Sequence, residues 1–184
     1  MDFSFMAASP IMSSLLMFGA MIGMMFAVTA LRNSIWGVVA LLGFTFVAGV
    51  FLGPILQAAL SFRNGAQLIG MAAGGTGIIF FSLATIATVT KKDFSFMGKF
   101  LFIGLVLLIV ASLANLFFQI PALSLTISAI AVLIFSAYIL FDVSRIVNGG
   151  ETNYVMATLG LFLNIFNLFI HLLHLLMAFA GDRD

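Results

Sequence analysis

The amino-acid sequence predicts an all-α membrane protein, a polytopic bundle of six transmembrane helices in a single domain over residues 1–184. Two observations support this prediction. Of the 184 residues, 64% are hydrophobic and 7% are charged, whereas soluble domains have about 45–50% apolar and about 25% charged residues. The few charges also divide the chain into long uncharged runs. No soluble surface of ordinary polarity can be built from this composition.

The lengths of the uncharged runs predict the spans. A helix needs about 20 apolar residues to cross the hydrocarbon layer of a bilayer. One run, residues 100–141, is too long for a single span and must turn back on itself. We expect this turn at Gln119–Pro121, because proline disfavours helix at the residue before it. The six expected spans are residues 10–31, 35–58, 67–90, 98–118, 122–146 and 153–180.

The basic residues predict the orientation, because short cytoplasmic connections are enriched in Lys and Arg. The first, third and fifth connections contain five of them, Arg32, Lys91, Lys92, Lys99 and Arg145. The opposite side has only Arg63 and Arg183. The odd-numbered connections are therefore expected in the cytoplasm, and both termini outside.

The composition also excludes several classes of function. Cysteine is absent, which excludes disulfides and thiolate chemistry. A net charge of +1 gives no clustered basic face for nucleic acid. The sequence has no His-Glu-x-x-His motif, no pair of carboxylates within a span and no serine matched to a base. We therefore expect no enzyme and no cofactor.

Polar side chains within the spans indicate either function or hydrogen bonds between helices. The last span contains Asn164, Asn167, His171 and His174, which fall on one face of a helix. This polar stripe either lines a hydrated pathway for ions or protons, or holds neighbouring helices together. Two histidines are too few for a zinc site, so we expect no metal. Imidazole titrates near neutral pH, which makes both histidines candidate pH sensors.

Asp142 lies at the inner end of the fifth span and has two interpretations. In one, it forms a local ion pair with Arg145 on the same helix, which stabilises a helix only weakly. In the other, it faces the centre of the bundle and coordinates or gates a cation. The residues alone leave both interpretations open.

Six further residues are expected to shape the helices: Gly53, Pro54, Gly70, Gly74, Asn115 and Gln119. Two glycines four residues apart allow close approach of helices, as in Gly70–Gly74. The Gly53–Pro54 pair is expected to kink or end the second span. The two amides, also four residues apart, are expected to bond across helices near the outer surface.

Several separated blocks resemble a known family. They are LGPIL at 52–56, KDFSF at 92–96, ANLFFQIPAL at 114–123, LFD at 140–142, GGETNY at 149–154 and NLF at 167–169. The same blocks occur in the same order in the Bax inhibitor/YccA family. From about Ser9 to the C-terminus the chain resembles this family, and most closely its bacterial YccA branch.

The resemblance implies a seven-helix bundle with a central last helix in the bacterial inner membrane. It also implies a function and two alternatives. The leading one is modulation of a membrane protease of the FtsH type, which is associated with the YccA branch. The first alternative is a pH-sensitive leak of a cation such as calcium, in which a pair of carboxylates on the last two helices acts as a latch. The second is a purely structural membrane subunit.

The sequence departs from the family pattern at the second of these carboxylates. The first matches Asp142, but the second falls on Asn164, which cannot ionise, so a two-acid latch is incomplete. A plain hairpin centred on Gly149–Gly150 would set Asp142 opposite Ala157. The pairing of Asp142 with Asn164 therefore follows from the resemblance and not from the spacing.

A second departure lies at the start of the chain, where Met1–Ser9 contains no counterpart of the family's first helix. Without this helix, a bundle that begins in the cytoplasm becomes one that begins outside. This agrees with the orientation predicted from the basic residues. We therefore expect a truncated chain or a misassigned start.

Overall fold

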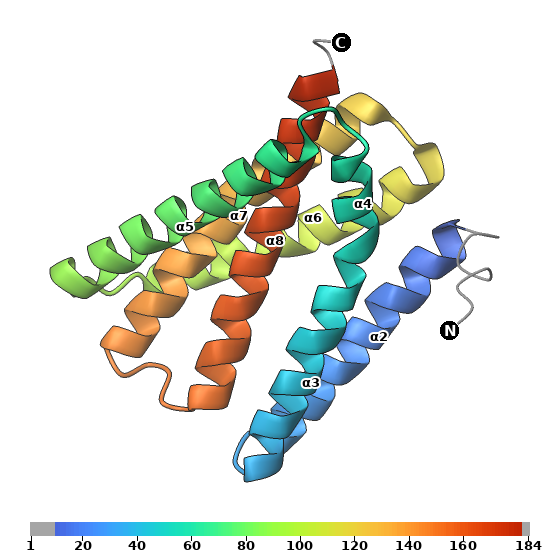
Figure 1. Ribbon diagram of the computed structural model, residues 1–184. Coiled ribbons are helices and arrows are strands. Elements are labelled where there is room, and N and C mark those ends of the chain that lie inside the picture. The colour runs from blue at the N-terminus through green and yellow to red at the C-terminus, as the bar shows by residue number, and fades with distance from the viewer. Residues whose placement is uncertain (1–9, 182–184) are drawn as a thin grey trace. The chain divides into compact units, whose positions relative to one another are not determined.

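The computed structural model describes residues 10–181, with side chains from Leu15 onward, and all regular structure in this range is helical. The expectation of a truncated start depends on Met1–Ser9, and the predicted orientation depends in part on Arg183. These residues lie outside the described range. The elements are α2 (Pro10–Leu31), α3 (Ile35–Phe51), α4 (Gly53–Leu60), α5 (Gly65–Thr90), the 3-10 helix η1 (Ser95–Met97), α6 (Gly98–Phe118), α7 (Pro121–Val147) and α8 (Tyr154–Gly181) (Figure 1). The predicted all-α helical bundle is confirmed, and the helix bounds lie within two residues of the expected spans when α3 and α4 are taken together as the second span.

Five helical segments of the described chain are long and apolar enough to cross a membrane: 35–60, 65–90, 95–118, 121–147 and 154–181. The described side chains of α2 add a shorter apolar helix, Leu15–Leu31. Large apolar side chains are exposed along these helices, among them Phe46, Val89 and Phe100. Soluble monomers rarely expose so much contiguous apolar surface. The exposed side chains therefore identify surfaces that contact lipid.

The helices form two compact units, which divide between Leu52 and Gly53. In the first unit, α2 packs against α3 as a helical hairpin. The tight turn between them requires a glycine at position 37, because a Cβ there would lie 2.5 Å from the carbonyl oxygen of Leu31. The expected break in the second span is present, since α3 ends at Phe51 and α4 begins at Gly53, one residue before Pro54.

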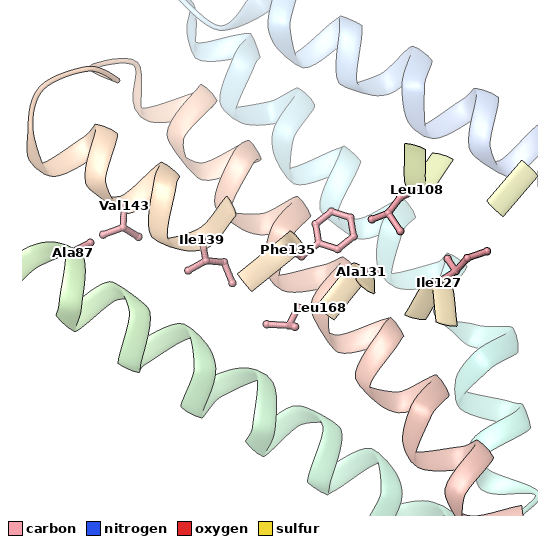
Figure 2. Packing of buried hydrophobic residues seen from close by; sticks show 8 residues of the cluster. All are labelled: Ala87, Leu108, Ile127, Ala131, Phe135, Ile139, Val143 and Leu168. Atoms are coloured by element: carbon pink, nitrogen blue, oxygen red, sulfur yellow. The ribbon is translucent and has the colours of Figure 1, made fainter. Parts of the chain in front are cut away.

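In the second unit, α7 packs against α5, α6 and α8 (Figure 1). Its buried residues recur every four positions, which places them on one ridge of the helix. This ridge forms most of a core that α5, α6 and α8 complete (Figure 2). The core residues are Ile127, Ala131, Phe135, Ile139 and Val143 of α7, with Ala87, Leu108 and Leu168.

Within the second unit, the last helix has neighbours along most of its length. Helix α8 contacts α4, α5 and α7, and each residue from Leu159 to Ala178 is buried or half-buried. Leu173 adds a smaller core with Ala59, Leu68 and Ala72, where α8 meets α4 and α5. The central position of the last helix within a whole bundle stays a prediction, since these contacts describe the second unit alone.

Two connections meet at one end of the second unit, where the C-terminal part of α7 anchors the connection between α5 and α6. The Ser144 hydroxyl donates to the carbonyl oxygen of Lys92 over 2.8 Å and accepts from the amide of Phe94 over 3.1 Å. The Asn148 side chain also donates to the Lys92 carbonyl, over 3.2 Å. The third and fifth connections, with their basic residues, therefore lie at the same end.

Within the second unit, the predicted close packing at Gly70 and Gly74 does not occur. Both glycines are exposed, and a Cβ added to either would meet no atom within 4 Å. The glycine that approaches α8 is Gly75, where an added Cβ would lie 3.7 Å from a methyl group of Leu172. The face of α5 that packs is thus rotated away from the Gly70–Gly74 pair.

The predicted bond of Asn115 and Gln119 across helices is replaced by a local one. The Asn115 side-chain oxygen accepts from the amide of Ile120 over 3.0 Å. Gln119 has a φ of 51°, and its amide donates to the Asn115 carbonyl over 2.8 Å. A left-handed residue after a helix, followed by a proline that begins the next, is a common helix end. Both residues therefore close the turn between α6 and α7.

Candidate functional site

The candidate site lies along the contact between α7 and α8. The Asn164 amide of α8 donates to Oδ2 of Asp142 on α7 over 2.8 Å, and Asn164 is only 7% exposed. A Cβ at Gly160 would lie 3.0 Å from the same Oδ2 atom, so the glycine makes room for the carboxylate. The structure thus brings together Asp142 and Asn164. The plain hairpin that sets Asp142 opposite Ala157 is wrong, because residues 148–153 form a longer connection.

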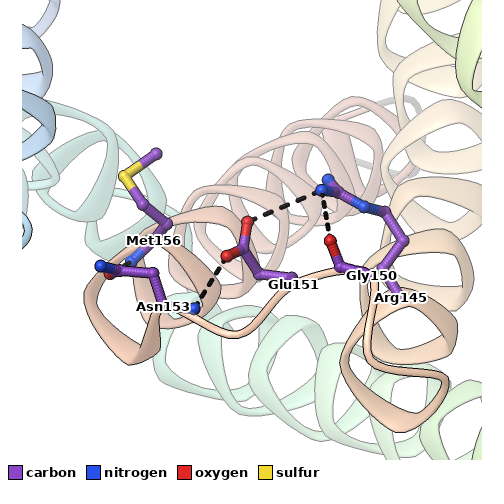
Figure 3. Close-up of polar contacts among 5 residues, drawn as sticks. All are labelled: Arg145, Gly150, Glu151, Asn153 and Met156. Carbon is purple, nitrogen blue, oxygen red and sulfur yellow. Dashed lines mark hydrogen bonds and ion pairs between the residues drawn. The ribbon is translucent and has the colours of Figure 1, made fainter.

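Arg145 forms its ion pair with Glu151 and not with Asp142. Nη2 of Arg145 lies 3.7 Å from Oε2 of Glu151 and donates to the carbonyl oxygen of Gly150 over 3.2 Å (Figure 3). Its guanidinium carbon lies 5.5 Å from the centre of the Phe141 ring. The connection folds back over Arg145, since the amides of Gly150 and Glu151 donate to the Arg145 carbonyl oxygen. The hydrogen-bond partner of Asp142 is therefore a neutral amide.

The GGETNY block builds this connection. Gly149 has a φ of +75°, a conformation that favours glycine. Glu151 accepts from the Asn153 amide over 3.0 Å, and the Asn153 side chain accepts from the Met156 amide over 3.1 Å (Figure 3). A side-chain oxygen that accepts from an amide of the first turn caps a helix N-terminus. The block thus fixes the start of α8, and with it the register that brings Asn164 to Asp142.

Farther along α8, both histidines contact one hydroxyl. Nδ1 of His174 lies 3.0 Å from Oγ of Ser128, and Nδ1 of His171 lies 3.2 Å from the same atom. Ser128 is on α7 and is 1% exposed. The Phe135 ring stacks on the His171 ring, with 6.0 Å between the ring centres. Asn167 instead donates to the carbonyl oxygen of Leu163 on its own helix, over 2.8 Å. Three of the four stripe residues therefore bond to α7.

Ser128 was not predicted as a site residue, because α7 contains several serines and nothing in their spacing selects one. The register of α7 against α8 is the signal from which Ser128 could be identified. An antiparallel pair anchored at Asp142 and Asn164 sets His174 opposite Val132, which is one helical turn from Ser128. The contact thus follows from the pairing that only the family resemblance supplied.

A cavity of about 610 Å³ lies where α8 ends and α5 begins. It is lined by Arg63, Asn64, Leu68, Met71, Leu176, Phe179 and Ala180. None of these residues belongs to the polar stripe. Over residues 10–181, no cluster of three or more His, Cys, Asp or Glu residues could hold a metal ion.

A comparison with known families identifies the family of the chain. A family model described as "Inhibitor of apoptosis-promoting Bax1" matches residues 1–181. The chain belongs to this Bax inhibitor family.

Several curated proteins are similar to this Bax inhibitor family member. The modulator of FtsH protease YccA from Escherichia coli K12 is 43% identical over 164 residues, which cover 89% of this chain and 74% of that protein. The inner membrane protein YccA from Escherichia coli O6:H1 matches to the same extent. A membrane protein from Vibrio cholerae is 44% identical over 91% of this chain and 75% of its own length.

Proposed function

We propose that this Bax inhibitor family protein modulates a membrane protease of the FtsH type in a bacterial inner membrane. The observation that supports this most is its 43% identity, over 89% of the chain, to a protein named as a modulator of that protease. A matching relative is named as an inner membrane protein. We propose no catalytic activity for the chain itself, since a modulator acts by binding.

The end of the second unit that contains the third and fifth connections is the surface we propose for the protease. Hydrogen bonds from Ser144 and Asn148 hold these connections together, so a partner meets one continuous surface. The enrichment of basic residues there favours a cytoplasmic location. In this orientation Arg63 and both termini lie outside.

Co-purification tests this proposal. The tagged chain, extracted from its native host in mild detergent, is expected to retain an FtsH-type protease and to lengthen the half-life of a membrane substrate of that protease. Reversing charge with Lys91→Glu and Lys92→Glu is expected to weaken both effects. Arg63→Glu at the opposite end is the matched control. Repeated absence of the protease, with an unchanged substrate half-life, contradicts the proposal.

A second candidate function, a cation leak, is favoured by one observation. Asp142 is an acidic side chain within a span whose hydrogen-bond partner is the neutral Asn164. Ionisable groups at such positions commonly mark ion pathways. In this candidate, Asn167 and the two histidines continue the pathway along α8, and Asp142 binds the cation.

Calcium flux into reconstituted liposomes tests the leak. Asp142→Asn is expected to change the flux, whereas Asp93→Asn, in the exposed third connection, is the matched carboxylate control. Asn164→Asp restores the second carboxylate, and two carboxylates in hydrogen-bond contact share a proton, so its flux is expected to depend on pH. Equal flux from wild type and Asp142→Asn removes Asp142 from the mechanism. A purely structural subunit is the function left if both assays fail.

A further inference from the structure

We propose that His171, Ser128 and His174 form a proton relay, in which one buried hydroxyl passes a proton between two imidazoles. The ligand of this site is the proton. The proposal stands on the shared contact, since both Nδ1 atoms lie within hydrogen-bond distance of the same Oγ. It depends neither on the protease nor on a cation leak.

The chemistry of a hydroxyl makes the two contacts unequal. A serine hydroxyl has one hydrogen to donate and two lone pairs that accept, and a neutral imidazole has one N–H and one bare nitrogen. Ser128 therefore donates to one Nδ1 atom, and the other Nδ1 atom must donate to Ser128. In the neutral site the two histidines are consequently in opposite tautomers, one with hydrogen on Nδ1 and the other with hydrogen on Nε2.

This arrangement can transfer one proton while the number of protons held by the bridge stays the same, and the transfer reverses both tautomers. The starting state has His174 with hydrogen on Nδ1, donating to Ser128, and His171 with hydrogen on Nε2, accepting from Ser128. A proton binds Nε2 of His174, its Nδ1 proton moves to Oγ, and the Oγ proton moves to Nδ1 of His171. His171 then releases its Nε2 proton. One proton has entered at His174 and one has left at His171, and the hydrogen bonds now point the other way.

Within the described residues of the second unit, the stretches of α4, α5 and α7 that pack against the two histidines contain no other titratable side chain near Ser128. Helices α4 and α5, which pack against α8, contain no titratable side chain. On α7 the titratable residues Tyr138, Asp142 and Arg145 lie ten or more positions beyond Ser128, about 15 Å or more along the helix. Phe135 lies between them and the relay and stacks on His171. Both histidines are half-buried.

The tautomers provide a direct test, because the chain has only two histidines. Solid-state NMR of the ¹⁵N-histidine-labelled protein in lipid bilayers distinguishes Nδ1–H from Nε2–H. The wild type is expected to show one histidine of each kind. Ser128→Ala is expected to lower the Nδ1–H population roughly threefold to fifteenfold, which corresponds to the loss of one interhelical hydrogen bond. Ser136→Ala, on the same helix, is the matched control and is expected to leave the spectrum unchanged.

Proton flux into liposomes tests the transfer itself, with no protease or calcium present. The wild type is expected to conduct protons above protein-free vesicles, Ser128→Ala to lose this flux, and Ser128→Thr to keep it because the hydroxyl remains. Helix content measured by circular dichroism confirms that each variant is folded. The proposal is overturned by histidines of one tautomer in the wild type, by equal flux in wild type and Ser128→Ala, or by zinc binding that accounts for the NMR shifts.

Discussion

The contact between α7 and α8 has polar side chains at two levels, and their hydrogen bonds differ in kind. Near the connections, Asp142 accepts from Asn164, and the donor is fixed because a carboxylate has no hydrogen to give. At the other level, Ser128 meets His171 and His174, and the hydrogen can lie in more than one place. The first level can fix a geometry, whereas the second can also move a proton. Polar residues of one helical stripe thus acquire different chemistry from the partner that each one meets.

The largest expected loss of stability comes from replacing a residue that lies between the two levels. Phe135 lies between them on α7, is 8% exposed and stacks on His171. Phe135→Ala leaves a cavity in the core and is expected to cost about 3 kcal/mol of unfolding free energy. Leu133→Ala is the control, since Leu133 is 71% exposed toward lipid. Thermal unfolding in detergent measures both variants, and equal losses would show that the Phe135 ring is not part of a packed core.

The second-largest expected loss of stability comes from a substitution next to Asp142. Gly160→Ala adds a Cβ that would lie 3.0 Å from the Asp142 carboxylate, so the carboxylate must shift from Asn164. We expect the unfolding free energy to fall by about 1–2 kcal/mol, as for other substitutions that add a group to a packed site. Gly77→Ala is the matched control, because an added Cβ there meets open space. A Gly160→Ala protein as stable as the control, with histidine tautomers unchanged, would contradict the tight contact at Asp142.

A smaller loss of stability is expected in the connection between α5 and α6, which bonds to α7 near Asp142. Ser144→Ala removes the hydroxyl that bonds Lys92 and Phe94. The loss is expected to be about 1 kcal/mol, the contribution of a typical hydrogen bond. Hydrogen exchange of the Phe94 amide should therefore be roughly fivefold faster, while the histidine signals stay as in the wild type. Unchanged exchange at Phe94 would show that the connection is held by other contacts.

The smallest effect is a pH dependence in the same connection. The Asp93 carboxylate accepts from the Ser95 amide over 2.8 Å, and hydrogen bonding by the Ser95 side chain and, to a lesser extent, by this amide lowers the pKa of Asp93 from its ordinary value of 3.8. A lowered pKa in the folded state means that the bond stabilises the connection above pH 3.8 and is lost as the pH falls through the lower value. The chemical shift of the Ser95 amide should follow this titration. Asp93→Asn should abolish it, and a midpoint above 3.8 would contradict the sign.

Much of the fold follows from the sequence because the membrane imposes simple physical limits. Uncharged runs of sufficient length locate the spans, and Gln119–Pro121 locates the turn that divides the longest run. Glycines were harder to interpret, because Gly70 and Gly74 have the spacing of a packing motif while Gly75 makes the contact with α8. The sequence pattern gives the spacing but not the rotation of a helix about its axis.

The candidate site was predictable only in part. The polar stripe of α8 was evident from its periodicity, and its residues include both levels of the contact. The partners on α7 depend on register, which the residues 148–153 set through several local bonds. Arg145 illustrates the difficulty, since its partner Glu151 lies in the connection and not on the helix that the spacing suggested.

The hydrogen bonds of Ser144 have a mechanical consequence. Ser144 follows Asp142 by two residues on α7, and its hydroxyl bonds the main chain about fifty positions earlier at Lys92 and Phe94. A protein that pulls on the connection between α5 and α6 therefore pulls directly on the end of α7. Asp142 lies about half a helical turn from this anchor, so the connection at the membrane surface and the buried acid are attached to the same short stretch of α7.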